Sequence, residues 1–349
     1  MSKGHNTQLT LAASCTILPV VQDLTRRIKE KALALGFDLV GVTPAAASDY
    51  GDFYERWLAQ GYAGGMAYLA RPDAVAKRRD PRRVMPEARS VVVVGLNYYQ
   101  GQVETPPGSE RGRVARYAWG DDYHDLMWAR LDELAAFVGA EAGRPVAHRR
   151  YVDTGPLLER ELAVRAGLGW FGKNTLLINP IFGSWLFLGV LLLDLELAYD
   201  APFDADRCGA CTRCIQACPT RCILPDHTLD ASRCISYLTI ELKSTYIPAE
   251  LRPQVGDWVF GCDVCQEVCP WNRFARPVAE RAFQPRLGMP MPDLAELLAL
   301  DDEAFRRRFH GSPIQRAKRR GLERNAAVAL DNLRGKKAKD EGQKVTKAG

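Results

Sequence analysis

The chain has 349 residues, of which 47% are hydrophobic and 26% charged, a balance that excludes a disordered chain, a collagen-like chain and a disulfide-stapled miniprotein. Its length is typical of two or three domains with a large core. The net charge of +5 is uneven, because residues 306–349 hold 14 Lys and Arg against 4 Asp and Glu. This excess suggests an anionic macromolecular partner, although a solvated surface with a frayed tail would give the same pattern.

Residues 1–20 show no clear period and are predicted to be disordered. Residues 21–200 then alternate helical and strand patterns, which predicts an α/β domain. Its predicted elements, in chain order, are a helix at 23–35, a strand at 37–42, a strand at 91–96, a helix at 123–138, a helix at 156–166 and a strand at 186–197. The last strand is apolar throughout, so we expect it to be covered on both faces.

The composition changes after residue 200. Residues 201–280 are rich in cysteine, proline and short turns, and we interpret them as a second domain. A proline-punctuated linker at 277–292 leads into a helical region at 281–333, with two or three short helices between 293 and 330. Residues 334–349 form a basic, polar tail that is predicted to be disordered.

The longest apolar stretch, 181–193, is broken by Gly183, Ser184 and Gly189. A membrane-spanning helix needs about 20 apolar residues, so none is predicted. Residues 1–22 hold neither a continuous apolar signal nor a twin-arginine motif. We therefore expect a cytosolic protein, in which closely spaced cysteines are more often metal ligands or redox centres than disulfides.

Nine of the ten cysteines lie between Cys208 and Cys269. The run C-x2-C-x2-C-x3-C-P, residues 208–219, is typical of bacterial ferredoxins that bind [4Fe–4S] clusters, and residues 262–270 repeat it without the leading cysteine. Two clusters need eight thiolates. The two motifs supply seven of them, namely Cys208, Cys211, Cys214, Cys218, Cys262, Cys265 and Cys269. The eighth is Cys222 or Cys234, and spacing alone does not decide between them.

The alternative interpretation of this segment is a zinc ribbon or a set of buried thiols. Zinc ribbons use two cysteine pairs with a long gap and need neither the third cysteine nor the trailing proline. Spacing therefore favours two [4Fe–4S] clusters. Cys15 has no partner motif and is interpreted as an ordinary thiol.

Residues 167–172 fit the pattern G-x-G-x-x-G, and Lys173 follows them. A dinucleotide-binding fingerprint follows a strand and opens a helix, whereas this one follows a predicted helix and leads to a strand. Nicotinamide dinucleotide binding is therefore not predicted here.

The same region carries a family resemblance. The stretches Val-Asp-Thr-Gly-Pro-Leu-Leu-Glu-Arg at 152–160, Ala-Gly-Leu-Gly-Trp at 166–170, Gly-Lys-Asn at 172–174, Arg-Cys-Ile-Ser-Tyr-Leu-Thr-Ile-Glu at 233–241 and Gly-Cys-Asp at 261–263 together resemble the epoxyqueuosine reductase family. The resemblance runs from about Phe37 to about Leu330. It implies a cobalamin-dependent enzyme with two [4Fe–4S] clusters that makes the last reduction in queuosine synthesis. The implied substrate is the wobble base of the tRNAs with GUN anticodons, which carry aspartate, asparagine, histidine and tyrosine.

The resemblance also implies a fold and a ligand set. The fold would be an α/β cobalamin-binding domain, a ferredoxin-like double-cluster domain and a short α-helical C-terminal region related to HEAT repeats. The cysteine of the family's R-C-I-S motif is a ligand, which selects Cys234 over Cys222. The resemblance assigns one cluster to Cys208, Cys211, Cys214 and Cys269, and the other to Cys218, Cys234, Cys262 and Cys265.

Reduction of an epoxide to an alkene takes two electrons and two protons and releases water. Side chains cannot supply the electrons, so cofactors must. The departing oxygen needs a proton, and the family's proton donor corresponds to Asp153. From its position alone, Asp153 would be read as a helix cap. The resemblance places Arg78, Arg116, His124, Arg160 and Ser236 in the cobalamin pocket, beside Asp153. Lys173 and Asn174 are predicted to contact cobalamin or RNA phosphate, and the alternative for both is a solvated turn.

The basic stretch 316–325 is predicted to contact tRNA phosphates through Arg316, Lys318, Arg319, Arg320 and Arg324. Family members usually continue with further helices, whereas this chain has the basic tail. We also expect a low-potential electron donor of the flavodoxin or ferredoxin type, no membrane partner and a monomeric protein. The alternative functions are a cobalamin-dependent reductive dehalogenase, a ferredoxin-like electron carrier and an RNA-binding protein with structural clusters.

Overall fold

The computed structural model describes the backbone of residues 9–102 and 109–348 and the side chains of 20–102 and 109–336. A four-stranded sheet in the order β1-β2-β7-β4 lies at its centre, and every neighbouring pair of these strands is antiparallel. Its strands are β1 (Leu39–Pro44), β2 (Ser90–Asn97), β7 (Leu186–Leu193) and β4 (His148–Tyr151). The helices and strands predicted to alternate along residues 21–200 thus form a mixed α/β unit, and its central sheet is antiparallel.

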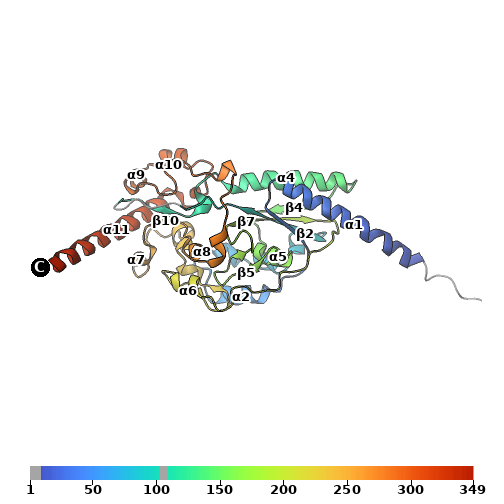
Figure 1. Cartoon of the computed structure of the whole chain (residues 1–349), viewed down its shortest axis with the longest axis horizontal. Coiled ribbons are helices and arrows are strands. Elements are labelled where there is room, and N and C mark those ends of the chain that lie inside the picture. The colour runs from blue at the N-terminus through green and yellow to red at the C-terminus, as the bar shows by residue number, and fades with distance from the viewer. Residues whose placement is uncertain (1–8, 103–108, 349) are drawn as a thin grey trace, which may run out of the picture.

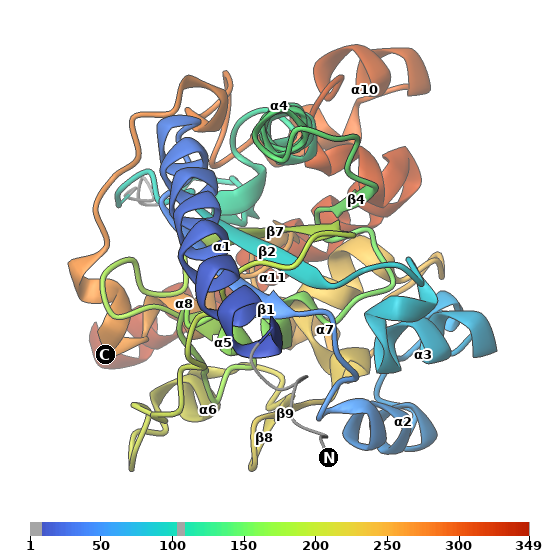
Figure 2. The same ribbon diagram turned by 90° about the vertical axis from the view of Figure 1, so that its right-hand side faces the viewer.

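Both faces of the sheet are covered, as Figures 1 and 2 show. The helices α1 (Leu9–Ala34) and α4 (Tyr123–Glu141) pack on one face, and α5 (Glu159–Arg165) packs on the other. Because side chains alternate along a strand, Val92 joins the core under α1 and α4 while Val91 and Val93 join the core under α5. The strand predicted at 186–197 ends at Leu193, and the prediction that it is covered on both faces is confirmed.

Several element bounds differ from those predicted. The helix α1 begins at Leu9, inside the stretch that was expected to be disordered. The helix α5 begins at Glu159 rather than at Pro156, because Asp153 has a φ of 61° and the chain turns there before it becomes helical. Two further helices, α2 (Gly51–Ala59) and α3 (Pro72–Arg79), stand beside the sheet.

The cysteine segment contains short elements joined by turns. They are α6 (Arg213–Ala217), the β8 (Ile223–Leu224) and β9 (Thr228–Leu229) hairpin, α7 (Arg252–Val255), β10 (Trp258–Phe260) and α8 (Val264–Glu267). Strand β3 (Arg113–Val114) pairs in parallel with β10, and β5 (Trp170–Phe171) pairs with β6 (Leu177–Ile178). Pairing of β3 with β10 joins the first predicted domain to the second.

Single turns of other helix types complete the connections. The 3₁₀ turns are η1 (Ala67–Leu69), η2 (Pro81–Arg83), η3 (Arg116–Ala118), η4 (Ala231–Arg233), η6 (Pro270–Phe274), η7 (Arg281–Phe283) and η8 (Pro313–Ala317), and η5 (Tyr237–Glu241) is a π-helical turn.

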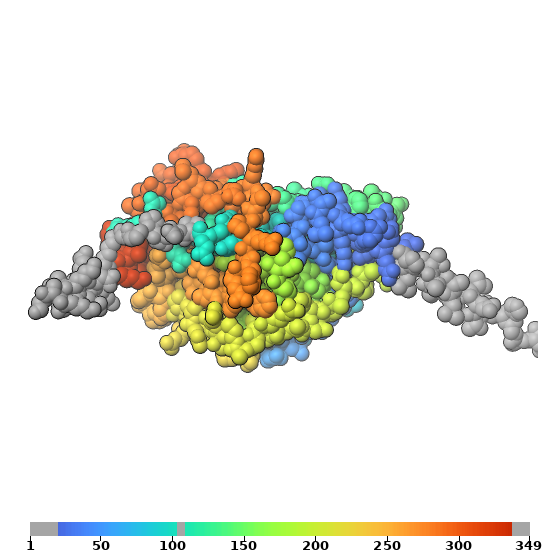
Figure 3. Space-filling model, in the orientation of Figure 1, coloured from blue at the N-terminus to red at the C-terminus, as the bar shows by residue number. Residues whose placement is uncertain are grey.

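The predicted linker is packed against the sheet domain. Val278 donates a backbone hydrogen bond to Tyr99 at 2.7 Å, and Phe283 is only 2% exposed in the core beneath α4. Figure 3 shows this segment in orange, crossing the face of the molecule. Residues 277–292, here called the proline strap, are therefore an extended segment packed against the sheet domain and not a flexible linker.

The C-terminal region consists of α9 (Leu294–Leu298), α10 (Asp302–Arg308) and the long α11 (Lys318–Ala348). Buried Asn325 of α11 donates to the carbonyls of Thr239 and Val259, at 2.7 and 2.8 Å, which ties the helix to the cysteine segment. The helix continues to Ala348, so the stretch 334–348 is helical where the sequence predicted disorder.

Candidate active site and cluster sites

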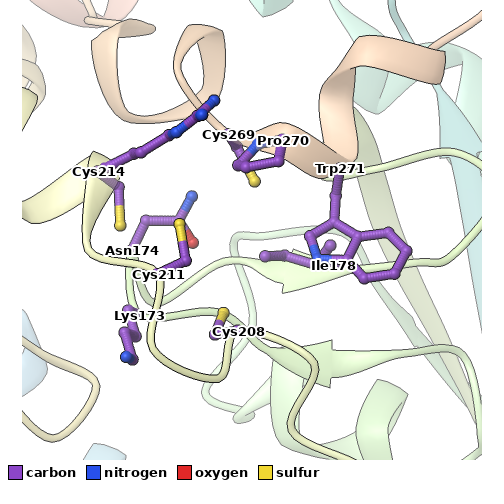
Figure 4. A pocket seen from close by; sticks show the side chains of 10 residues that line it. Lys173, Asn174, Ile178, Cys208, Cys211, Cys214, Cys269, Pro270 and Trp271 are labelled. Carbon is purple, nitrogen blue, oxygen red and sulfur yellow. The ribbon is translucent and has the colours of Figure 1, made fainter.

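Four cysteines from two distant parts of the sequence surround a small cavity of about 40 Å³. Cys208, Cys211 and Cys214 come from the loop before α6 and from α6 itself, and Cys269 comes from the end of the second motif. Figure 4 shows their sulfur atoms directed toward the space between them. These are the four cysteines that the resemblance assigns to one cluster.

Asn174 lies between this cavity and a much larger one, and it lines both. Its side chain is 4% exposed, and its Oδ1 accepts a hydrogen bond from the Leu176 N–H at 3.3 Å. The Nδ2 has no hydrogen-bond partner in the part of the chain that the structure describes. A buried donor without a partner is costly, and the sulfur atoms of an iron–sulfur cluster are acceptors, so the residues present fit such a group.

Lys173 lines the small cavity and not the large one, and its Nζ donates to the Gly209 carbonyl at 2.6 Å. The structure therefore places Lys173 beside the first cysteine set.

Five cysteines line one wall of the large cavity, namely Cys218, Cys222, Cys234, Cys262 and Cys265. The Sγ atoms of Cys218 and Cys222 are 3.4 Å apart. The hydrogen bond from Cys222 lowers the pKa of Cys218 to about 5, and a hydrogen bond from Cys222 also lowers the pKa of Cys234. Tertiary structure thus brings both Cys222 and Cys234 to the second cysteine set.

Among the side chains that the structure describes, residues 20–102 and 109–336, no three His, Cys, Asp or Glu form a group suited to a single metal ion. The cysteines instead stand around two cavities.

The large cavity has a volume of about 1020 Å³ and lies between the sheet domain and the cysteine segment. Its lining mixes aromatic rings from α2 with charged and polar side chains. Five of the predicted cofactor-contacting residues line it, namely Arg78, Asp153, Arg160, Asn174 and Ser236. A cavity of this size that also borders the second cysteine set has room for a macrocyclic cofactor.

Asp153 lies in the loop between β4 and α5, and its side chain is exposed to the cavity. The Tyr123 hydroxyl donates to its Oδ2 at 3.1 Å. The N-cap of α5 is Leu158, so Asp153 does not cap that helix, and the capping alternative is wrong.

Two residues that the sequence analysis did not select stand next to Asp153. Both carboxylate oxygens of Glu159 accept from the Asp153 N–H, at 2.9 and 3.1 Å. Removal from water, and then the negative charge of Asp153, raise the pKa of Glu159 to about 8. Burial likewise raises the pKa of Tyr123. Glu159 directly precedes Arg160, and Tyr123 directly precedes His124, in the sequence. Both therefore lie in the motifs from which the site residues were predicted, and those motifs are the sequence signal that could have identified them.

Arg116 and His124 do not line the cavity. Arg116 is 6% exposed, its backbone N–H donates to Asp263 at 2.7 Å, and its guanidinium lies over the ring of Trp119. The Nδ1 of His124 is 2.6 Å from Asp122, and its Nε2 is buried without a partner among the described residues. The structure places both as packed side chains behind the cavity wall.

The five predicted RNA-contacting cations have different environments. Arg324 is turned inward, where its guanidinium donates to the carbonyls of Leu238, Leu242 and Ser244. Lys318 and Arg320 are exposed, and Arg319 pairs with Asp302 and Glu323.

Arg316 is exposed and does not line the large cavity. It pairs with Glu241 at 2.9 Å, and this hydrogen bond, with smaller contributions from Tyr68 and Asp153, raises the pKa of Arg316. Tyr68 and Asp153 both line the cavity. Of the five cations, Arg316 is thus the one that the structure brings near Asp153.

No helix in the described part of the chain is both long enough and apolar enough to cross a membrane.

Comparison with known proteins identifies two family models. Residues 78–154 match "Epoxyqueuosine reductase QueG, DUF1730", and residues 207–272 match the "4Fe-4S double cluster binding domain". The first match contains Asp153, and the second contains all nine cysteines of the cysteine segment.

Curated epoxyqueuosine reductases resemble the chain over most of its length. The one from Pseudomonas aeruginosa is 44% identical over 314 residues, which is 88% of this chain and 85% of its own. The one from Escherichia coli is 41% identical over 89% of this chain and 82% of its own.

A crystal structure of an epoxyqueuosine reductase with a tRNA-Tyr epoxyqueuosine-modified stem loop is 32% identical, with a TM-score of 0.81 over 89% of this chain and 82% of that one. A Bacillus subtilis epoxyqueuosine reductase, whose catalytic aspartate loop is swung out of the active site, has a TM-score of 0.80 and the same identity and coverage. With relatives this similar over nearly the whole chain, the chain belongs to the epoxyqueuosine reductase family.

Proposed function

We propose that this chain reduces epoxyqueuosine to queuosine at the wobble position of tRNAs with GUN anticodons, with Asp153 as the proton donor and cobalamin in the large cavity. Family membership establishes the reaction class, an oxidoreductase that acts on tRNA in queuosine biosynthesis. The observation that carries the finer proposal is the position of the Asp153 carboxyl on the wall of a cavity that also borders the second cysteine set.

The residues of the cavity have separate tasks in this proposal. Asp153 protonates the departing epoxide oxygen, which is a poor leaving group as an alkoxide. Tyr123 orients the Asp153 carboxyl by its hydrogen bond to Oδ2. Arg78, Arg160 and Ser236 line the part of the cavity that receives the cofactor.

Two cofactor types complete the reaction. Cobalamin would supply a low-potential cobalt centre for reduction of the epoxide. The first cluster would be held by Cys208, Cys211, Cys214 and Cys269, and the second by Cys218, Cys234, Cys262 and Cys265. The first set lies near the surface and the second on the cavity wall, an order suited to carrying single electrons inward from a flavodoxin or ferredoxin donor.

Recognition of the tRNA is proposed to involve the cations at the start of α11. The relative crystallised with a modified stem loop shows that such RNA binds to an enzyme of this fold. Arg316 near the cavity, together with exposed Lys318 and Arg320, would contact phosphates around the inserted base. Arg324 would support the helix from inside instead. The family resemblance relates the C-terminal region to HEAT repeats, and in this chain that region consists of α9, α10 and α11.

The test is an anaerobic reconstitution. The purified chain, loaded with iron, sulfide and cobalamin, is mixed with an epoxyqueuosine-containing tRNA stem loop and a chemical reductant. We expect queuosine to appear by mass spectrometry, with loss of one oxygen per modified base, only when cobalamin and reductant are both present. Turnover without cobalamin would contradict the proposed cofactor.

Removal of the basic tail tests the RNA part of the proposal. Ending the chain after Leu333 removes six Lys and Arg, Arg334 among them, and two acidic residues. We expect weaker stem-loop binding and a shallower dependence of log K on log salt, because fewer counterions are released. Binding measured by fluorescence anisotropy between about 50 and 200 mM salt checks this. An unchanged salt slope would remove the tail from the interface.

A further inference from the structure

Asp153 is held in an unusual backbone conformation. Its φ is 61°, and the Thr154 N–H donates to the Val152 carbonyl at 2.6 Å, so Asp153 is the central residue of a three-residue turn. A γ-turn with positive φ is rare and strained, and residues other than glycine seldom adopt it. Such strain persists only where neighbouring groups hold the turn in place.

Neighbouring groups hold both the backbone and the side chain of this turn. Gly155, two residues later, packs so closely on Tyr151 that a Cβ at this position would lie 2.4 Å from the Tyr151 ring. The Tyr123 hydroxyl holds the Asp153 side chain, and the two oxygens of Glu159 hold the Asp153 backbone N–H. Glu159 is the first residue of α5, so its carboxyl is anchored to a helix that packs on the sheet.

We infer that Glu159 is a positioning residue, whose carboxyl latches the Asp153 turn against α5 and so keeps the Asp153 carboxyl directed into the large cavity. This inference rests on the proposed role of Asp153, although its structural part does not depend on that role. The relative whose catalytic aspartate loop is swung out of the active site shows that a loop of this type has more than one position in the family.

The energetic reason is the balance between strain and hydrogen bonding. Without an acceptor at Glu159, the Asp153 N–H would lose both of its side-chain hydrogen bonds, and the strained turn would relax toward an ordinary conformation. Molecules in the relaxed state would lack a proton donor at the epoxide. The observed rate would then fall in proportion to the fraction of molecules whose turn is closed.

The electrostatic surroundings of Glu159 give a second, independent signature. The charged groups that face it are Asp153 in its own loop, Arg160 next to it on α5 and Arg78 from α3. Because its pKa is raised from 4.5 to about 8, the folded protein holds a proton between these values that the unfolded chain has lost. Stability contributed by Glu159 therefore falls as the pH rises from about 4.5 to about 8.

Glu159→Ala in the reconstituted holoenzyme tests the latch. We expect kcat to fall by about twofold to tenfold, as for loss of one hydrogen bond between neutral groups, with KM for the stem loop little changed. Iron and cobalamin content should stay at wild-type levels. Amide hydrogen exchange of a peptide covering residues 151–158 should become faster, and this readout needs no activity. Glu133→Ala, which alters an exposed carboxyl of α4, is the control and should change neither measurement.

Glu159→Gln separates positioning from charge. The glutamine carbonyl still accepts the Asp153 N–H, so exchange of the 151–158 peptide should remain near that of the wild type. The variant has no titrating carboxyl, so its melting temperature should fall less than that of the wild type between about pH 5 and pH 8. Wild-type exchange and wild-type kcat in Glu159→Ala would overturn the latch. Faster exchange in Glu159→Ala with unchanged kcat would keep the latch and instead contradict the role of Asp153.

Discussion

Asp153→Asn is expected to lower turnover of the reconstituted enzyme by about 10²- to 10⁴-fold, the usual contribution of a positioned general acid. The amide has no proton to transfer, so the departing oxygen must leave as an alkoxide. Asparagine tolerates a positive φ, and its carbonyl can still accept the Tyr123 hydroxyl, so the turn at φ 61° should survive the change. Turnover is followed as queuosine formed per enzyme by mass spectrometry.

The control for this variant is Asp132→Asn, which makes the same change on the exposed face of α4, where Asp132 pairs with Arg150. This variant should have wild-type turnover. Asp153→Asn should also keep the cobalamin absorbance and the iron content of the wild type. Full activity of Asp153→Asn would remove Asp153 from the mechanism.

Cys234→Ser is expected to lose the second cluster, and with it about half of the bound iron, since each cluster holds four irons. Serine oxygen is a poor ligand for this cluster type, whose irons are held by thiolates. The first set, around the small cavity, draws on none of the residues near Cys234 and should keep its cluster. Iron and acid-labile sulfide per chain, together with the electron paramagnetic resonance signal of the reduced protein, measure the result.

Cys222→Ser is the matched variant. Cys222 is 2% exposed and its Sγ lies 3.4 Å from that of Cys218, so it borders the second set without being assigned to it. Full iron content in this variant, beside the loss in Cys234→Ser, would support the assignment made from the R-C-I-S motif. Loss of iron in Cys222→Ser with full iron content in Cys234→Ser would instead assign Cys222 as the ligand of the second cluster.

Local spacing allowed the cluster cysteines to be predicted. A ligand loop of C-x2-C-x2-C type is short, so sequence spacing nearly fixes how the sulfurs can converge. Cys269 is distant in sequence, and its place beside Cys208 follows from the packing of α6 against α8. Spacing left open only the choice between Cys222 and Cys234, which the family resemblance assigns to Cys234.

Charged residues were harder to predict. Arg316 and Arg324 belong to the same basic stretch, yet Arg316 is exposed and pairs with Glu241, whereas Arg324 donates to three backbone carbonyls. Arg116 was expected at the cofactor and is buried behind the wall of the cavity. An arginine can serve a phosphate, a carboxylate or a set of carbonyls, and only the neighbours supplied by the fold decide which.

By itself, the sequence determined the cluster motifs and the buried strands around Val93 and Leu191, because each depends on local spacing or local apolar pattern. The family resemblance, and not spacing, selected Asp153. Tertiary structure decided the antiparallel order of the sheet, the packing of the proline strap and the length of α11. It also decided that Glu159 and Tyr123 meet Asp153. These features depend on contacts between residues far apart in the chain or on different elements, whose free energy no local pattern records.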